Sequence, residues 1–142
     1  MIAPIDDYGH EENAAIAKQL ADAGVPVHTG GHGQREGLAT HWELWTMVEG
    51  GMSPIEALAA ATRVPAESLG MGADLGTIEP GKLADLVIVD GQPDRNIRDS
   101  DKINAVIQNG RVFNPLTLNE KITGQRTPTP LYWQGKPESA IR

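Results

Sequence analysis

The 142-residue sequence contains no cysteine, which excludes disulfide bonds, thiolate catalysis and zinc sites built from cysteine. It also has no apolar run near the roughly 18 residues of a membrane helix. The longest apolar stretches, "IEALAAAT" and "LADLVIV", are short or interrupted. No basic leader or hydrophobic segment follows Met1, so we expect no membrane partner and no secretory signal. If Met1 is the true start, this pattern predicts a cytoplasmic protein.

Positive charge is scarce. The chain has 12 Lys and Arg residues against 19 Asp and Glu residues, which gives a formal net charge of −7. The sequence has no basic cluster, and binding to a phosphate backbone depends on Lys and Arg. We therefore expect no nucleic-acid partner. The length allows one domain of ordinary size, or one lobe with an appendage.

Two apolar patterns in the first half of the chain predict helices. Residues 11–23 place Ile16 and Leu20 at helical spacing, and Gly24 follows where a C-terminal cap belongs. Residues 38–48, "LATHWELWTMV", place Leu38, His41/Trp42, Trp45 and Val48 on one helical face. Each pattern is typical of a helix that buries one side.

The clearest local signal is the start of a third helix. Ser53 stands at the N-cap, Pro54 at the first helical position, and Glu56 three residues after the cap. This arrangement predicts a capping box. The stretch "PAESLG" predicts a further helical turn that ends at Gly70.

Strand signals occur once in the first half of the chain and repeatedly in the second half. Residues 25–29, "VPVHT", predict one short buried strand before a glycine-rich loop, since a residue before proline is extended. After Gly72, residues 76–89 predict a short strand, a Pro80-Gly81 turn and a second strand beginning at Leu86. Residues 103–115 predict a β-hairpin around an Asn-Gly turn.

Together these signals predict an α/β unit over residues 1–72 and a small β lobe over residues 73–122. Residues 123–142 are rich in proline and predict an extended arm, on which Tyr132 and Trp133 could dock onto another surface. The single strand of the α/β unit has no partner strand within its own unit. A further part of its sheet is therefore expected to come from elsewhere.

Three runs of the sequence together resemble a known family. They are "ADAGVPVHTGGHGQREGLATHWELWTMVEGGMSPIEALAAATRVPAESLG", "GTIEPGKLADLVIVDGQP" and "VIQNGRVF". Over residues 3–120 the chain resembles the C-terminal part of the metal-dependent amidohydrolase superfamily, most of all its imidazolonepropionase-like branch associated with TolB-like propellers.

The resemblance implies the last strand and following helices of a (β/α)8 barrel, plus a small β-sandwich lobe that contains the antiparallel hairpin. A whole barrel takes about 250 residues. We therefore expect a C-terminal part of a longer enzyme, inactive alone, whose partner is the missing N-terminal barrel segment or another copy of the chain.

The resemblance also implies a divalent metal, with zinc expected, in an intact enzyme that hydrolyses carbon–nitrogen bonds of cyclic amides or peptide-like substrates through metal-activated water. His32 stands where most of the superfamily has an aspartate, after Gly30-Gly31. It is expected to be a metal ligand or proton relay, and the alternative is a loop histidine bonded to backbone. His28, four residues earlier, could share the metal. No tight metal binding is expected from this chain alone.

Other candidates lie around this loop. The position of Tyr8 and His10 suggests the loop after the seventh strand, where substrate contacts can occur. Gln34 and Arg35 could contact substrate or only cap the next helix. We treat all four as candidate substrate-loop residues.

His41 and Glu43 match the family's helix after the eighth strand, where the glutamate is expected to orient neighbouring loops. The alternative is that both are surface residues flanking Trp42 and Trp45, which are predicted to be buried. In the first case, His41 and Glu43 are structural support for the site.

Two further motifs do not support a site. The loop "TGGHGQREG" lacks the Lys-Ser/Thr pair of a phosphate loop. The carboxylates Asp90, Asp94, Asp99 and Asp101 lack the spacing of an EF-hand, and turn chemistry explains them better.

Two hypotheses compete with the enzyme fragment. The chain could be a non-catalytic module that binds a partner through its exposed strand and Trp-bearing helix. It could also self-assemble, since an unpaired strand promotes association. An upstream reading frame encoding His-x-His after a strand would favour the enzyme.

Overall fold

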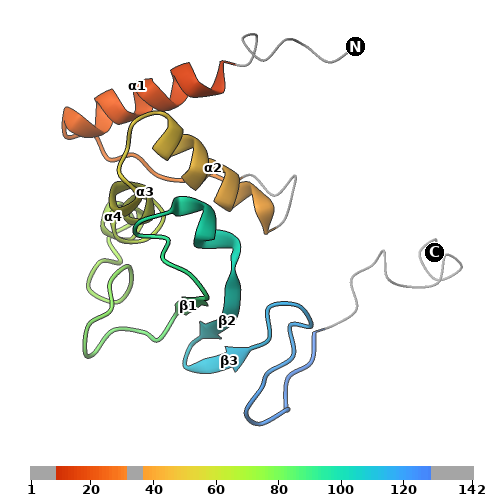
Figure 1. The fold of residues 1–142 in the computed structure, drawn as a ribbon. Helices are drawn as coiled ribbons and strands as arrows, with labels where there is room; N and C mark the ends of the chain where they lie inside the picture. The colour runs from red at the N-terminus through yellow and green to blue at the C-terminus, as the bar shows by residue number, and fades with distance from the viewer. Residues whose placement is uncertain (1–8, 32–36, 129–142) are drawn as a thin grey trace, which may run out of the picture. The chain divides into compact units, whose positions relative to one another are not determined.

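The computed structural model describes residues 9–31 and 37–128. The chain divides into two compact units, Met1–Leu83 with Val89–Ile103, and Ala84–Ile88 with Asn104–Arg142. The first unit contains the helices and the second contains the β-hairpin (Figure 1). The predicted domain boundaries at residues 72 and 122 stay a prediction. None of the described helices combines the length and the hydropathy needed to cross a bilayer.

Helix α1 spans His10–Asp22, as the sequence predicts to within one residue at each end. Gly24 follows with a φ of +84°, and its N–H donates to the Ala21 carbonyl at 3.0 Å. The left-handed backbone at this point favours glycine. The predicted apolar face is wrong, however, because Ile16 and Leu20 are 53% and 45% exposed.

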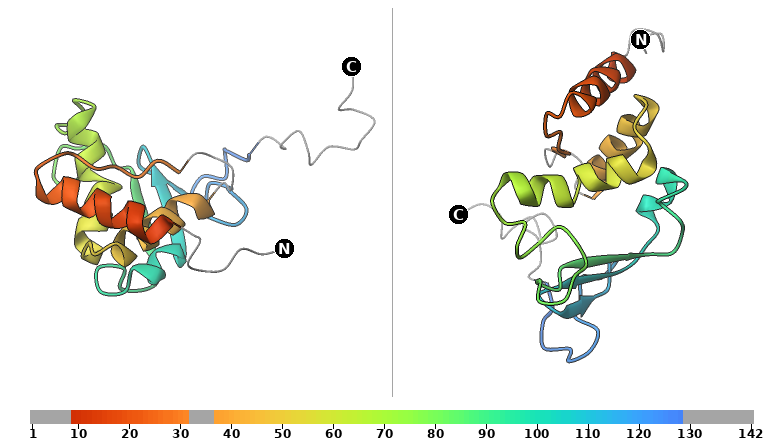
Figure 2. Two further views of the ribbon diagram at one scale, coloured as in Figure 1. Left: turned by 90° about the horizontal axis from the view of Figure 1, so that it is seen from above. Right: turned by 90° about the vertical axis from the view of Figure 1, so that its left-hand side faces the viewer.

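The reason lies in how α1 meets helix α2, which spans Leu38–Glu49. A Cβ added at Gly50, the residue after α2, would lie 2.4 Å from both the carbonyl carbon and the Cβ of Ala14. The helices therefore approach each other at small residues, and Ala14 is buried there. Both helices lie side by side in Figures 1 and 2. The larger apolar side chains of α1, Ile16 and Leu20, are exposed instead.

Helix α3 spans Pro54–Ala60 and confirms the predicted capping box. The Ser53 hydroxyl accepts from the Glu56 N–H at 3.3 Å, and the Glu56 carboxylate accepts from the Ser53 N–H at 2.6 Å. Helix α4 spans Arg63–Ser68 and confirms the further helical turn before Gly70, whose φ is +74°.

The core of the first unit forms around α2. The 3-10 helix η2 (Ile97–Asp101) contacts α2 and brings Ile97 into this core. Partly buried Val27, from the extended segment after α1, packs against the same cluster. The buried members are Leu44, Met47, Met52, Ala57, Ala60 and Ile97.

The predicted strand at residues 25–29 is wrong. This segment forms no strand, and Val25 is 46% exposed. The Thr29 N–H donates to the carbonyl of Ala60 in α3 at 3.1 Å. A strand is defined by its ladder to a neighbour, and the described part of the first unit supplies no neighbouring strand here.

The short strand predicted after Gly72 is also wrong. Residues 70–85 form turns held by Lys82, whose ammonium donates to the Gly72 carbonyl at 2.8 Å and to the Thr77 hydroxyl. The β-branched residues of this segment therefore lie in a loop held by Lys82 and not in a strand.

The sheet confirms the other β signals. The Leu86 strand and the hairpin form as predicted, in the order β1-β2-β3. In the antiparallel hairpin, Val106 lies opposite Phe113. Asn109 and Gly110 have φ values of +48° and +75°, as a type I′ turn requires. The strands are β1 (Leu86–Val89), β2 (Ile103–Gln108) and β3 (Arg111–Phe113).

The capping box generates a stability prediction. Replacing Ser53→Ala removes the acceptor for the Glu56 N–H, and loss of such a cap costs about 1 kcal/mol. We expect that decrease in the free energy of unfolding, measured by urea denaturation followed by circular dichroism. The control is Gln19→Ala on the exposed surface of α1, which should change stability by less than about 0.5 kcal/mol. Equal effects of the two substitutions would contradict the cap.

Glu56 makes the same cap depend on pH. The Ser53 backbone N–H and then the Ser53 hydroxyl hold the pKa of Glu56 below its ordinary value. A carboxylate with a lowered folded pKa stabilises the fold above its unfolded pKa of about 4.3, and this contribution is lost as pH falls through the folded pKa. We expect Glu56→Gln to destabilise the chain at neutral pH and much less in acid, as measured by urea denaturation at both pH values. A loss that does not change with pH would exclude this role.

Candidate functional site

A hollow of about 610 Å³ lies between α1, α2 and the extended segment that follows α1. Three of the candidate residues line it, namely His10 at the start of α1, His28 in the extended segment and Glu43 on α2. Much of the remaining lining is apolar, including Val27 and Met47. The structure therefore brings part of the predicted set into one place.

Helix α2 holds the end of the extended segment. The Glu43 carboxylate accepts a hydrogen bond from the Gly30 N–H. A Cβ added at Gly31 would lie 2.9 Å from the Thr40 hydroxyl and 3.1 Å from the Thr40 nitrogen, so only glycine fits without displacement. Two successive residues are thus fixed against α2. No sequence pattern indicates the contact of Thr40 with Gly31, because that contact depends on how the loop packs against the helix.

His28 is tied to α4. Its Nε2 lies 2.9 Å from the hydroxyl of Ser68, forty residues further along the chain. This hydrogen bond, together with the bond from Thr29 to α3, anchors the extended segment on its other side. The role of His28 as a metal ligand stays a prediction, and its Nε2 is engaged with Ser68 in the structure.

His41 takes part in a separate network between α2 and η2. Its Nδ1 lies 3.1 Å from the hydroxyl of Ser100, which is buried. Trp45 Nε1 donates to the same hydroxyl and to the Ile97 carbonyl, each at 3.0 Å. An indole nitrogen can only donate, so the hydroxyl hydrogen of Ser100 is available for Nδ1 of His41. His41 therefore joins two helices and does not share contacts with Glu43.

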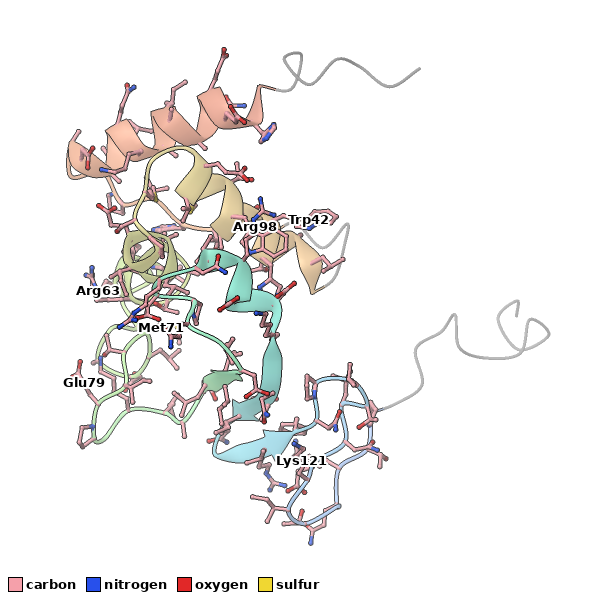
Figure 3. All side chains as sticks on the ribbon, in the orientation of Figure 1. Trp42, Arg63, Met71, Glu79, Arg98 and Lys121 are labelled. Carbon is pink, nitrogen blue, oxygen red and sulfur yellow. The ribbon has the colours of Figure 1, made fainter. Side chains whose placement is uncertain are left out.

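The two tryptophans differ from the prediction that both are buried. Trp45 is partly buried, with the Arg98 guanidinium 4.4 Å from its ring centroid. Arg98 also pairs with Glu49 at 2.5 Å. Trp42 is 44% exposed, so its predicted burial is wrong. Figure 3 shows Arg98 beside α2 and Trp42 nearer the start of the helix. The core face of α2 is instead formed by Leu44 and Met47.

Several candidates lie outside the described residues. These are His32, Gln34, Arg35 and Tyr8, so their predicted roles stay predictions. Within residues 9–31 and 37–128, no three His, Cys, Asp or Glu side chains are grouped so that they could hold a metal ion. A catalytic zinc needs three protein ligands and a water. The described residues therefore do not by themselves fit a zinc ion.

The Glu43 contact generates a prediction about the backbone. We expect Glu43→Ala to speed exchange of the Gly30 amide hydrogen about tenfold or more, because a hydrogen bond to a charged acceptor contributes about 1.5–3 kcal/mol. Amide exchange followed by NMR measures this. Glu43→Gln keeps an acceptor oxygen and should retain part of the protection. Glu49→Ala, on the same helix, is the control and should leave Gly30 unchanged. Unaltered exchange in Glu43→Ala would show that the bond is absent in solution.

Comparison with known proteins identifies relatives of the sequence. The profile of the Amidohydrolase family matches residues 2–114. The imidazolonepropionase of Geobacillus kaustophilus is 42% identical over 80 residues, which are 53% of this chain and 19% of the relative. The imidazolonepropionase of Syntrophobacter fumaroxidans is 28% identical over 129 residues, 87% of this chain and 30% of the relative.

Solved structures give the same result. A Xaa-Pro dipeptidase with methionine bound in its active site matches with a TM-score of 0.65 and 32% identity, over 71% of this chain and 25% of that structure. Molinate hydrolase matches with a TM-score of 0.62 and 26% identity, over 85% of this chain and 30% of that structure. The chain thus spans less than a third of each of these proteins, and the predicted resemblance is confirmed. The chain belongs to the amidohydrolase family, whose members are hydrolases.

Proposed function

We propose that the chain is the C-terminal part of a metal-dependent amidohydrolase that hydrolyses carbon–nitrogen bonds of cyclic amides or peptide-like substrates. The observation that carries this proposal is the family match over residues 2–114, together with the structural likeness to a Xaa-Pro dipeptidase at 32% identity. Because the chain covers 25% of that structure, most of the active site in this proposal comes from residues of the missing barrel segment.

The peptide-like part of the proposal has support from a second structure. A prolidase complexed with N-methylphosphonate-L-proline matches with a TM-score of 0.63 and 30% identity, over 71% of this chain. The names of this protein and of the Xaa-Pro dipeptidase denote cleavage of a peptide bond next to proline. The relatives named imidazolonepropionase support the other substrate class.

In this proposal, the extended segment at residues 25–29, which forms no strand in the structure, would become the eighth strand of a barrel once strands of the missing segment pair with it. It follows one helix and precedes another, as a strand does in alternating β/α units. Its partly buried Val27 packs on the core of the first unit, and the exposed Val25, two positions earlier, would lie on the same face of such a strand. Active sites of such barrels lie at the C-terminal ends of the strands, which here means the residues directly after Thr29.

His32 is the proposed reactive residue of this chain, as metal ligand or proton relay. It comes directly after Gly31, and the contacts of Glu43 with Gly30 and of Thr40 with Gly31 fix the backbone up to that point. Glu43 is proposed as a positioning residue for the same reason. Zinc is the expected ion, and the further ligands it requires are assigned to the rest of the enzyme, because the described residues do not fit it alone.

A chimeric enzyme tests this proposal. The segment of the Syntrophobacter fumaroxidans imidazolonepropionase that matches this chain is replaced by the matching residues of this chain, a match of 129 residues that covers 87% of the chain. We expect the chimera to retain the activity of its parent, and His32→Ala in the chimera to lower kcat by about a hundredfold or more, as expected for loss of a proton-transfer group. Steady-state kinetics and metal content measure both results.

Two controls separate a site defect from a folding defect. His41→Ala, in the network between α2 and η2, tests a histidine that the proposal keeps out of the reaction. It should lower stability more than kcat. The intact circular dichroism spectrum of each chimera verifies folding. A folded chimera in which His32→Ala retains full activity would reject the proposed role of His32.

A further inference from the structure

The turn between β2 and β3 contains an Asn-Gly pair, in which the main chain can react with the asparagine side chain. Asn109-Gly110 is the one Asn-Gly pair in the chain, and both residues are exposed. The main-chain nitrogen that follows an asparagine can attack the side-chain amide carbon. Glycine in the second position permits this attack most readily, because it has no side chain to obstruct the approach and it reaches many backbone conformations.

We propose that Asn109 is a deamidation site, that the folded turn suppresses the reaction, and that opening of the turn releases it. In the first step, the Gly110 nitrogen bonds to Cγ of Asn109, and the side-chain nitrogen leaves as ammonia with the amide proton. The product is a cyclic succinimide. Water then opens the ring at one of its two carbonyls, which gives either aspartate or isoaspartate at position 109. The reaction requires only water.

Two hydrogen bonds restrain the reacting atoms in the second unit. The Gly110 N–H donates to the Ala84 carbonyl at 3.0 Å, so the attacking nitrogen is engaged. The Asn109 N–H donates to the Asp85 carboxylate at 2.6 Å, which fixes the backbone on the other side of the same residue. The nitrogen can reach Cγ only after the first bond breaks and the turn leaves its type I′ conformation. Residues 84 and 85 therefore act as a restraint on the reaction.

The products would disfavour return to the same turn. An aspartate at position 109 places a second carboxylate close to Asp85, and like charges at such a distance repel. An isoaspartate routes the main chain through the former side chain and adds one carbon to it. Since hairpin register is set by the turn, the pairing of Val106 with Phe113 would be disturbed. Each product would therefore keep the turn open, whereas the closed turn protects Asn109 from the reaction.

Mass spectrometry of the purified chain tests this proposal. Samples are incubated at mildly alkaline pH in buffer and in concentrated urea, and peptide mapping locates the change. Isoaspartate is identified by its enzymatic methylation. We expect deamidation at Asn109 to be about tenfold or more slower in buffer than in urea, because both restraining bonds are lost on unfolding. Asn104, which precedes Ala105 in β2, is the internal comparator and should react slowly in both.

Substitutions of Asp85 and Asn109 test which contact restrains the reaction. Asp85→Ala should raise the rate in buffer and leave the rate in urea unchanged, and Asp85→Asn, which keeps an acceptor oxygen, should lie between it and the unchanged chain. Asn109→Gly keeps a sequence suited to the turn and should abolish the modification at this position. If Asp85→Ala does not fold, the buffer and urea rates of the unchanged chain still decide. Equal rates in buffer and urea, or the absence of an effect in a folded Asp85→Ala variant, would overturn the proposal.

Discussion

Helix α2 is the element on which the described part of the first unit depends. Its buried side chains Leu44 and Met47 form the centre of the core, and α1, α3 and η2 all contact it. The close approach of Ala14 to Gly50 joins α1 to its C-terminal end. Near its other end, Glu43 and Thr40 hold the backbone of the glycine pair. One helix therefore supports both the core and the loop that the family resemblance singles out.

The features predicted correctly from sequence are those decided by neighbouring residues. The Ser53 cap forms from atoms within three positions of each other, and the Asn109-Gly110 turn needs only residues that tolerate positive φ. The bounds of α1 and α2 follow from periodicity and from a glycine at the end. The physical cause of each of these features lies within a few residues, so the packing of distant parts of the chain does not have to be known.

The features predicted wrongly depend on partners far away in the chain. Residues 25–29 have the composition of a strand, but a ladder requires a second strand that the described part of the first unit does not supply. The predicted apolar face of α2 contains Trp45 and Val48, whereas its buried residues are Leu44 and Met47, each one position earlier, because distant residues such as Ile97 pack against them. The contact of Ser100 with His41 spans 59 positions, and spacing alone gives no indication of it. The predicted site is therefore only partly placed, with His10, His28 and Glu43 around one hollow.

The anchoring of the β2–β3 turn also affects the order in which this part of the chain can fold. The turn is local, but Asp85 precedes Asn109 by 24 positions, so a loop must close before the bond between them forms. The entropic cost of closure rises only slowly with loop length. During synthesis, the segment that contains Asp85 leaves the ribosome first and is already present when the turn emerges. The hairpin can therefore be bound as soon as it is made, which shortens the time during which its strand edges are exposed to other chains.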